Sequence, residues 1–105
     1  MRHTIALIAA FPLSVSSVAL AADGAALFKQ HCATCHGATG QADTPAGQAL
    51  KVPHLAGDTK IAGMSDADVT AAIKANPKHA AVLKTLADAD LAALATYVKG
   101  LAAGK

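Results

Sequence analysis

The stretch His31-Cys32-Ala33-Thr34-Cys35-His36-Gly37 contains the pattern C-x-x-C-H. On one helical turn, two cysteines three positions apart lie on the same side, so each thiolate can add to one vinyl group of a single porphyrin. His36 follows Cys35 directly, and its imidazole can then bind the iron as the proximal axial ligand. We therefore expect Cys32 and Cys35 to attach one haem c covalently, with His36 as an iron ligand.

Three other uses of a cysteine pair compete with haem attachment: a redox dithiol, half of a zinc site and a structural disulfide. A thioredoxin-like C-x-x-C follows an apolar strand, whereas the segment 24–30 is not such a strand and the chain holds no β-branched run. A structural zinc ion requires four ligands, and no second cysteine pair is present. A disulfide across so short a loop would restrict little chain entropy. Haem attachment is the interpretation that the sequence favours.

The first 21 residues have the pattern of a secretory signal peptide. A short basic start, residues 1–4, precedes the apolar run 5–13, and Ala19-Leu20-Ala21 is a small-x-small cleavage site. The apolar run is too short to cross a bilayer, and no later segment approaches the required length. We expect cleavage after Ala21, no membrane span, and a soluble domain at 22–105 that is exported to the periplasm.

The exported part offers few large side chains for a core. It has about 84 residues, a size at which a core made of protein alone is marginal. Its only aromatic side chains are those of Phe28 and Tyr97, while alanine is abundant. A porphyrin would supply the missing bulk, so we expect the protein without haem to be largely unfolded.

The charged residues exclude two classes of function. The exported part carries eight Lys, no Arg, seven Asp and no Glu, and it lacks the basic stripe with interleaved aromatics that nucleic-acid binding requires. The Asp residues fall mainly at expected helix starts, so no acid/base pair for substrate turnover is visible. We expect a protein that is not an enzyme and binds no nucleic acid.

Three helices are expected from capping and periodicity. Asp23 can cap a first helix that runs to about Ala33, and residues 37–63 then form a long loop rich in Gly and Pro. The sequences 64–69 and 86–91 share one pattern, in which an apolar residue precedes the cap and pairs with another at the fourth helical position. The helix after Ser65 should stop near Asn76 because Pro77 follows. The last helix should end at Gly100 or just beyond, with Tyr97 packed against Gly24 and Phe28.

These features together resemble the class I c-type cytochromes, which are small monohaem electron carriers. The matching residues are Gly24, Phe28, Cys32, Cys35, His36, Gly37, Gly40, Pro53, Leu55, Gly57, Leu94 and Tyr97. The resemblance implies an all-α fold of about three to four helices wrapped around one covalently attached haem. It also implies that the Pro53 carbonyl accepts a hydrogen bond from the proximal imidazole N–H and that Leu55 packs on the ring.

The sixth iron ligand is where this chain departs from that family. Ordinary members place a Met before the last helix, and His79 occupies the corresponding place here. Met64 is the alternative ligand, although its apolar contact before a helix cap already explains the presence of a methionine there. A five-coordinate or water-bound iron is a third possibility. His54 should point away from the open face, and His31 should lie exposed near the haem edge. We expect His79, which would give a lower reduction potential than Met.

The expected function is one-electron transfer by a periplasmic monomer. Such a carrier docks briefly with redox partner proteins or serves a larger periplasmic oxidoreductase. Lys78 and Lys84 flank the distal segment and could weakly steer a partner. The alternative is a haem-based gas-binding or sensing protein in which His79 is a labile ligand. Peroxidase activity would need a distal acid/base, which only a displaced His79 could supply.

Overall fold

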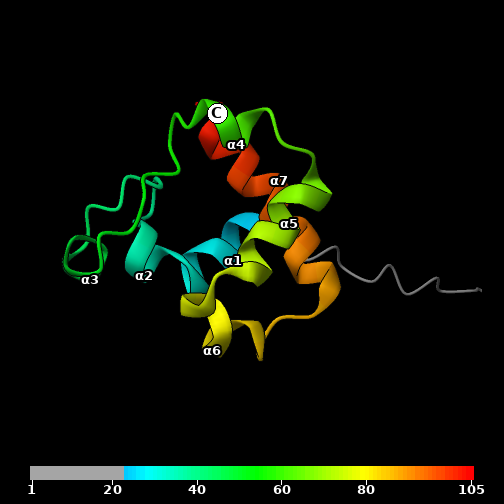
Figure 1. Cartoon of the computed structure of the whole chain (residues 1–105), viewed down its shortest axis with the longest axis horizontal. Helices are drawn as coiled ribbons and strands as arrows, with labels where there is room; N and C mark the ends of the chain where they lie inside the picture. The colour runs from blue at the N-terminus through cyan, green and yellow to red at the C-terminus, as the bar shows by residue number, and fades with distance from the viewer. Residues whose placement is uncertain (1–22) are drawn as a thin grey trace, which may run out of the picture.

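The computed structural model describes residues 23–105, and these fold into an all-α domain (Figure 1). The elements in chain order are α1 (Gly24–His31), α2 (Ala33–His36), α3 (Pro45–Ala49), α4 (Thr59–Ala62), α5 (Asp66–Ala75), the 3-10 helix η1 (Pro77–His79), α6 (Ala80–Leu83) and α7 (Asp88–Ala102). Only α1, α5 and α7 contain eight residues or more, and the others are single turns. The expected all-α fold is confirmed, while the signal peptide predicted for 1–21 lies outside the described residues.

The core forms where α1 and α5 pack against α7. Phe28 and Leu94 are the largest fully buried side chains, each 1% exposed. The Phe28 and Tyr97 rings lie 5.2 Å apart between centroids. A Cβ atom at Gly24 would lie 2.5 Å from the carbonyl oxygen of Ala93, so only glycine permits this approach of α1 to α7. The predicted packing of Tyr97 against Gly24 and Phe28 is confirmed.

The helix starts and stops follow from local chemistry. The hydroxyl of Ser65 accepts a hydrogen bond from the N–H of Asp68 at 3.1 Å, as expected of an N-cap. α5 ends at Ala75, just before Asn76 and Pro77, and α7 continues to Ala102. The first helix ends earlier than the expected Ala33, because Cys32 has φ −115° and interrupts it before α2 begins.

The stretch 37–63, expected to be a loop without elements of its own, contains α3 and α4. Thr44 caps α3 and Pro45 occupies its first turn, while the carboxylate of Asp58 caps α4. The expectation of an uninterrupted loop was therefore wrong. Periodicity could not reveal these helices, because each is a single turn and is too short to show an apolar period. The caps were the only signals available in the sequence.

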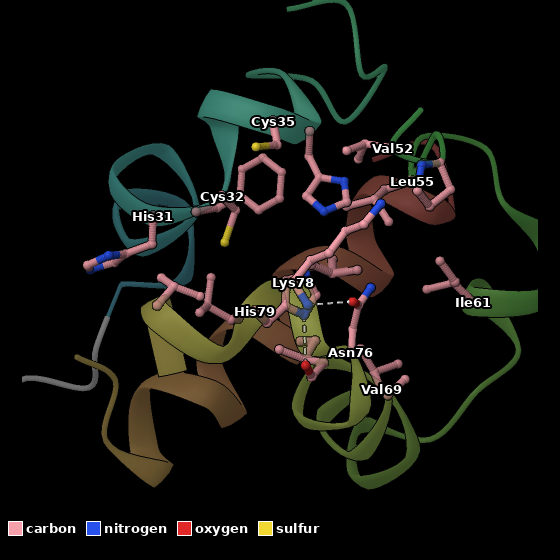
Figure 2. Close-up of a pocket in the computed structure, with 18 of the residues that line it drawn as sticks. His31, Cys32, Cys35, Val52, Leu55, Ile61, Val69, Asn76, Lys78 and His79 are labelled. Atoms are coloured by element: carbon pink, nitrogen blue, oxygen red, sulfur yellow. Dashed lines mark hydrogen bonds between the residues drawn. The ribbon is translucent and has the colours of Figure 1, made fainter. Parts of the chain in front are cut away.

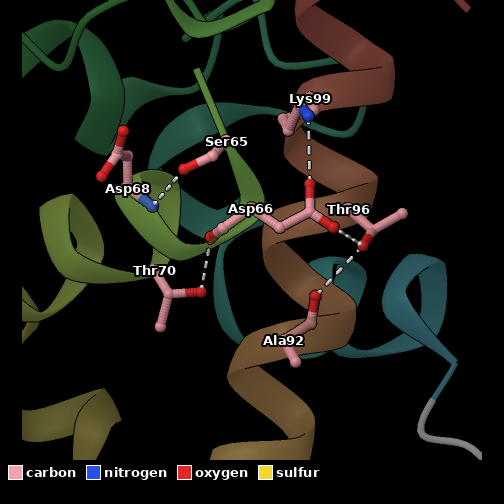
Figure 3. A network of polar contacts seen from close by, with 7 residues as sticks. All are labelled: Ser65, Asp66, Asp68, Thr70, Ala92, Thr96 and Lys99. Carbon is pink, nitrogen blue, oxygen red and sulfur yellow. Dashed lines mark hydrogen bonds and ion pairs between the residues drawn. The ribbon is translucent and has the colours of Figure 1, made fainter.

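A polar network joins the start of α5 to the middle of α7 (Figure 3). Lys99 forms an ion pair with Asp66 at 3.1 Å, and the hydroxyl of Thr96 donates to the other oxygen of the same carboxylate at 3.0 Å. These contacts pull the pKa of Asp66 below its usual value, chiefly through the hydrogen bonds from Lys99 and Thr96. The network therefore links the start of α5 to α7 at the protein surface.

Candidate haem site

A cavity of about 460 Å³ opens between α1, α2, α5, η1 and the segment 50–55 (Figure 2). This volume lies within the range of about 300–1,000 Å³ that is usual for ligand sites. Most of its lining is apolar, with Phe28, Leu55, Val69 and Leu94 among the buried members. The polar or sulfur-bearing lining includes His31, Cys32, Cys35, His36, Asn76, Lys78 and His79.

The two cysteines of the motif both line this cavity. Cys32 lies at the junction of α1 and α2, and Cys35 lies on α2. Burial, and to a smaller extent the neighbouring Cys35, raises the pKa of the Cys32 thiol to about 11. A redox dithiol needs a lowered thiol pKa so that a thiolate forms near neutral pH. The environment of Cys32 therefore disfavours the redox-dithiol interpretation.

Residues at the start of α3 and within it contact the turn that carries the motif. The Thr44 hydroxyl donates to the carbonyl of Thr34 at 2.7 Å and lies 3.3 Å from that of Cys35. A Cβ atom at Gly47 would collide with the Cys35 carbonyl oxygen, so α3 approaches the motif closely. Sequence reasoning missed both Thr44 and Gly47, although Thr44-Pro45 was a readable helix-start signal.

His36 lies at the end of α2 with its ring facing that of Phe28, 6.5 Å away between centroids. Burial lowers the pKa of His36, and the neighbouring His79 lowers it further. A hydrogen bond to the backbone of Pro53 raises the pKa of His36 instead. Because proline has no N–H, the group involved must be the Pro53 carbonyl. His36 Nδ1 is buried without a hydrogen bond of standard geometry. The lowered pKa favours the neutral imidazole, which is the form that binds a metal.

His79 projects from η1 into the same cavity, which His36 also lines. The two imidazole centroids are 6.3 Å apart, with 53° between the ring planes. His79 Nδ1 lies 2.7 Å from the carbonyl oxygen of Ile73. Because a carbonyl only accepts, Nδ1 carries the proton and the lone pair remains on Nε2. A backbone carbonyl that accepts the proton of the other ring nitrogen is the usual partner of a metal-binding histidine.

Of the remaining candidate residues, all but His54 line the cavity. Pro53, Leu55 and Met64 line the cavity, and Met64 also packs against the core. The amide of Leu55 donates to the carbonyl of Gly40 at 2.7 Å, which fixes the segment that crosses the cavity. His54 is exposed and does not line the cavity, whereas His31 is half-buried and does. His31 is thus less exposed than expected.

A comparison with known protein families identifies the chain. Residues 19–98 match the family model described as cytochrome C oxidase, cbb3-type, subunit III. The chain belongs to this family. As a member of the cbb3-type cytochrome family, it is a monohaem c-type cytochrome, as the motif and the resemblance implied. No curated protein matches the chain, and no solved structure matches it.

This cytochrome family implies haem c, and the residues of the cavity fit that group. Two imidazoles that bind one metal ion from opposite sides place their ring centres about 6 Å apart, because each metal–nitrogen bond is about 2 Å long. The spacing of His36 and His79 matches this value. Cys32 and Cys35 lie on one side of the cavity (Figure 2), and they line it together with His36 and His79. Within residues 23–105, no helix of this cytochrome has the length and apolar character needed to span a membrane.

Proposed function

We propose that this cytochrome is a periplasmic one-electron carrier in which Cys32 and Cys35 hold one haem c, with His36 and His79 as axial ligands. The observation that carries the proposal is the pair of imidazoles that face each other across an apolar cavity. When bound, haem supplies an iron that alternates between the ferrous and ferric states. Two imidazole ligands favour a lower potential than one imidazole and one thioether.

The side chains around the two histidines support transfer rather than substrate turnover. Phe28 and Leu55 are buried and keep water from the proximal face. The hydrogen bond from His79 Nδ1 to Ile73 keeps the distal imidazole in one orientation, so little rearrangement is needed between redox states. No carboxylate lines the cavity in the described part of the chain, so a distal acid/base for peroxidase chemistry would have to be His79 itself. We therefore assign no catalytic residue.

The ligand pair is tested by replacing His79 with methionine. The wild-type ferric protein should lack the weak band at the red end of the visible spectrum that a Met sulfur on ferric haem produces. His79→Met should acquire this band and have a higher reduction potential. Met64→Leu is the matched control and should leave both the spectrum and the potential unchanged. A wild-type band that disappears in Met64→Leu would assign the sixth position to Met64 instead.

Carbon monoxide separates electron transfer from gas binding. Because His79 is anchored through Ile73, the reduced wild-type protein should bind carbon monoxide slowly and incompletely at neutral pH. His79→Ala should bind it rapidly and with one molecule per haem. Fast stoichiometric binding by the wild type would instead support the sensing alternative, in which the distal ligand is labile.

The periplasmic location rests on the signal-like pattern of residues 1–21 and is tested by cell fractionation. The protein should appear in the periplasmic fraction with the mass of residues 22–105 plus one haem. A cytoplasmic holoprotein that retains residues 1–21 would contradict the location without affecting the ligand assignment.

A further inference from the structure

Besides His31, two polar residues that line the cavity have no role in holding the iron or the vinyl groups. They are Asn76 and Lys78, which precede His79 in the chain. Among residues 23–105, Lys78 is the only lysine in the cavity lining, and no carboxylate of this range lies there to neutralise it. Haem carries two propionates, and carboxylates at the edge of an apolar site require donors or cations. Asn76 and Lys78 offer one amide donor group and one cation for this purpose.

Their position relative to the cysteines is the first argument. In Figure 2 the sulfur atoms of Cys32 and Cys35 lie on one side of the cavity, and the side chains of Asn76 and Lys78 extend on the other. In haem, the vinyl groups and the propionates project from opposite edges of the porphyrin. A ring tethered at Cys32 and Cys35 would therefore direct its propionates toward Asn76 and Lys78.

The hydrogen bonds of the two side chains are the second argument. Lys78 Nζ donates to the carbonyl of Leu50 at 3.3 Å, and an ammonium group has two further N–H donors. Leu50 is 50% exposed, which places this contact at the mouth of the cavity. Asn76 Oδ1 accepts from the backbone N–H of Lys78 at 3.0 Å, so its NH₂ group can donate to a ligand. These hydrogen bonds orient the side chains of Lys78 and Asn76 and leave N–H groups on both that can donate to a carboxylate.

We propose that Lys78 and Asn76 form the propionate-binding site of this cytochrome, a proposal that rests on the haem c function above. Lys78 forms a charge-assisted hydrogen bond to a propionate, and Asn76 adds a neutral one. The ferrous site carries one positive charge fewer than the ferric site, so the Lys78 cation favours reduction. The pair therefore adjusts the potential as well as the orientation of the ring.

The test reads the propionates directly by redox-difference infrared spectroscopy. Cells fed 5-aminolevulinate labelled with ¹³C at its carboxyl carbon incorporate the label into haem only at the propionate carboxyls, so the isotope shift identifies their bands. Lys78→Met should shift these bands and lower the midpoint potential, while Lys78→Arg should largely restore both. Asn76→Ser keeps a side chain that can cap η1 but removes the NH₂ donor, and it should also shift the bands.

Lys84→Met is the matched control, because it removes the same charge from an exposed residue that does not line the cavity. It should leave the labelled bands at their wild-type positions. Labelled bands that are unchanged in either Lys78→Met or Asn76→Ser would overturn the paired site. The optical spectrum of the ligand pair is recorded for every variant, so a failure of the haem function itself would appear already in the wild type.

Discussion

A single residue, the N-cap Thr44 that precedes α3, stabilises the turn that carries the motif. Thr44 has two tasks, because its hydroxyl caps α3 through Gly47 N–H and donates to the carbonyl of Thr34. The Thr44 side chain thus connects the loop after the motif to the turn that contains Cys35 and His36. Local sequence signals reveal the cap, but the bond to a carbonyl ten residues earlier exists only in the folded chain.

Thr44→Val should destabilise the holoprotein by about 1–3 kcal/mol, because it leaves a helix start without its cap and a carbonyl without its donor. Guanidinium unfolding followed by the haem absorbance measures this loss. Thr44→Ser retains the hydroxyl and should stay close to the wild type. Equal losses in the two variants would contradict this account, because they would show that the methyl group of Thr44 matters as much as its hydrogen bonds.

Asp66 should titrate at a lower pH than an isolated aspartate. Because its folded pKa is depressed by Lys99 and Thr96, its contribution to stability is present above its usual value of 3.8 and is lost as the pH falls through the folded value. NMR of the carboxyl carbon measures this pKa. Thr96→Val and Lys99→Met should each raise the pKa of Asp66, and no change in either variant would contradict the network.

At the scale of elements, the approach of α1 to α7 depends on Gly24. The Cβ of any other residue would meet the Ala93 carbonyl at 2.5 Å, and backbone atoms cannot move aside as a flexible side chain can. The same contact brings Phe28 against Tyr97 and places Cys32 at the wall of the cavity. The packing of two helices thus positions the attachment motif.

Gly24→Ala should destabilise the protein by about 1–3 kcal/mol through this overpacking. Gly100 provides the control, because it lies within α7 and a Cβ there would meet no atom within 4 Å. Gly100→Ala should be neutral or stabilising by up to about 1 kcal/mol, since alanine is the better helix former. Thermal unfolding of the two holoproteins gives both values. A larger loss in Gly100→Ala than in Gly24→Ala would refute the close-approach argument.

At the scale of the whole molecule, a small core lies beside a large cavity. The buried cluster contains one aromatic side chain, Phe28, and its other members are small or aliphatic. Several of them, including Leu55, Val69 and Leu94, also line the cavity. A large flat group in the cavity would add apolar contacts to these side chains, so we expect the haem to contribute to folding as well as to chemistry.

The protein without haem should therefore be largely unfolded. A variant with both Cys32 and Cys35 replaced by alanine, purified without haem, should show weak helical far-UV circular dichroism and no cooperative melting transition. The wild-type holoprotein provides the reference and should melt cooperatively. A helical, cooperatively melting variant would show that the protein core is sufficient by itself.

The sequence by itself determined the motif, the all-α class, the caps of α5 and α1, and the expectation of His79 opposite His36. These features depend on residues close together in the chain, where spacing and side-chain chemistry act directly. The matching helix starts at 64–69 and 86–91 were readable for the same reason.

Only the tertiary structure decided how distant segments meet. The bond from His79 Nδ1 to the Ile73 carbonyl, the contact of α3 with the motif turn, and the single-turn helices within 37–63 could not be read from local spacing. Each depends on backbone groups whose partners are chosen by packing, and a backbone carbonyl has the same chemistry at every position in the sequence. The placement of Asn76 and Lys78 opposite the cysteines is likewise set by how α5 and η1 pack around the cavity.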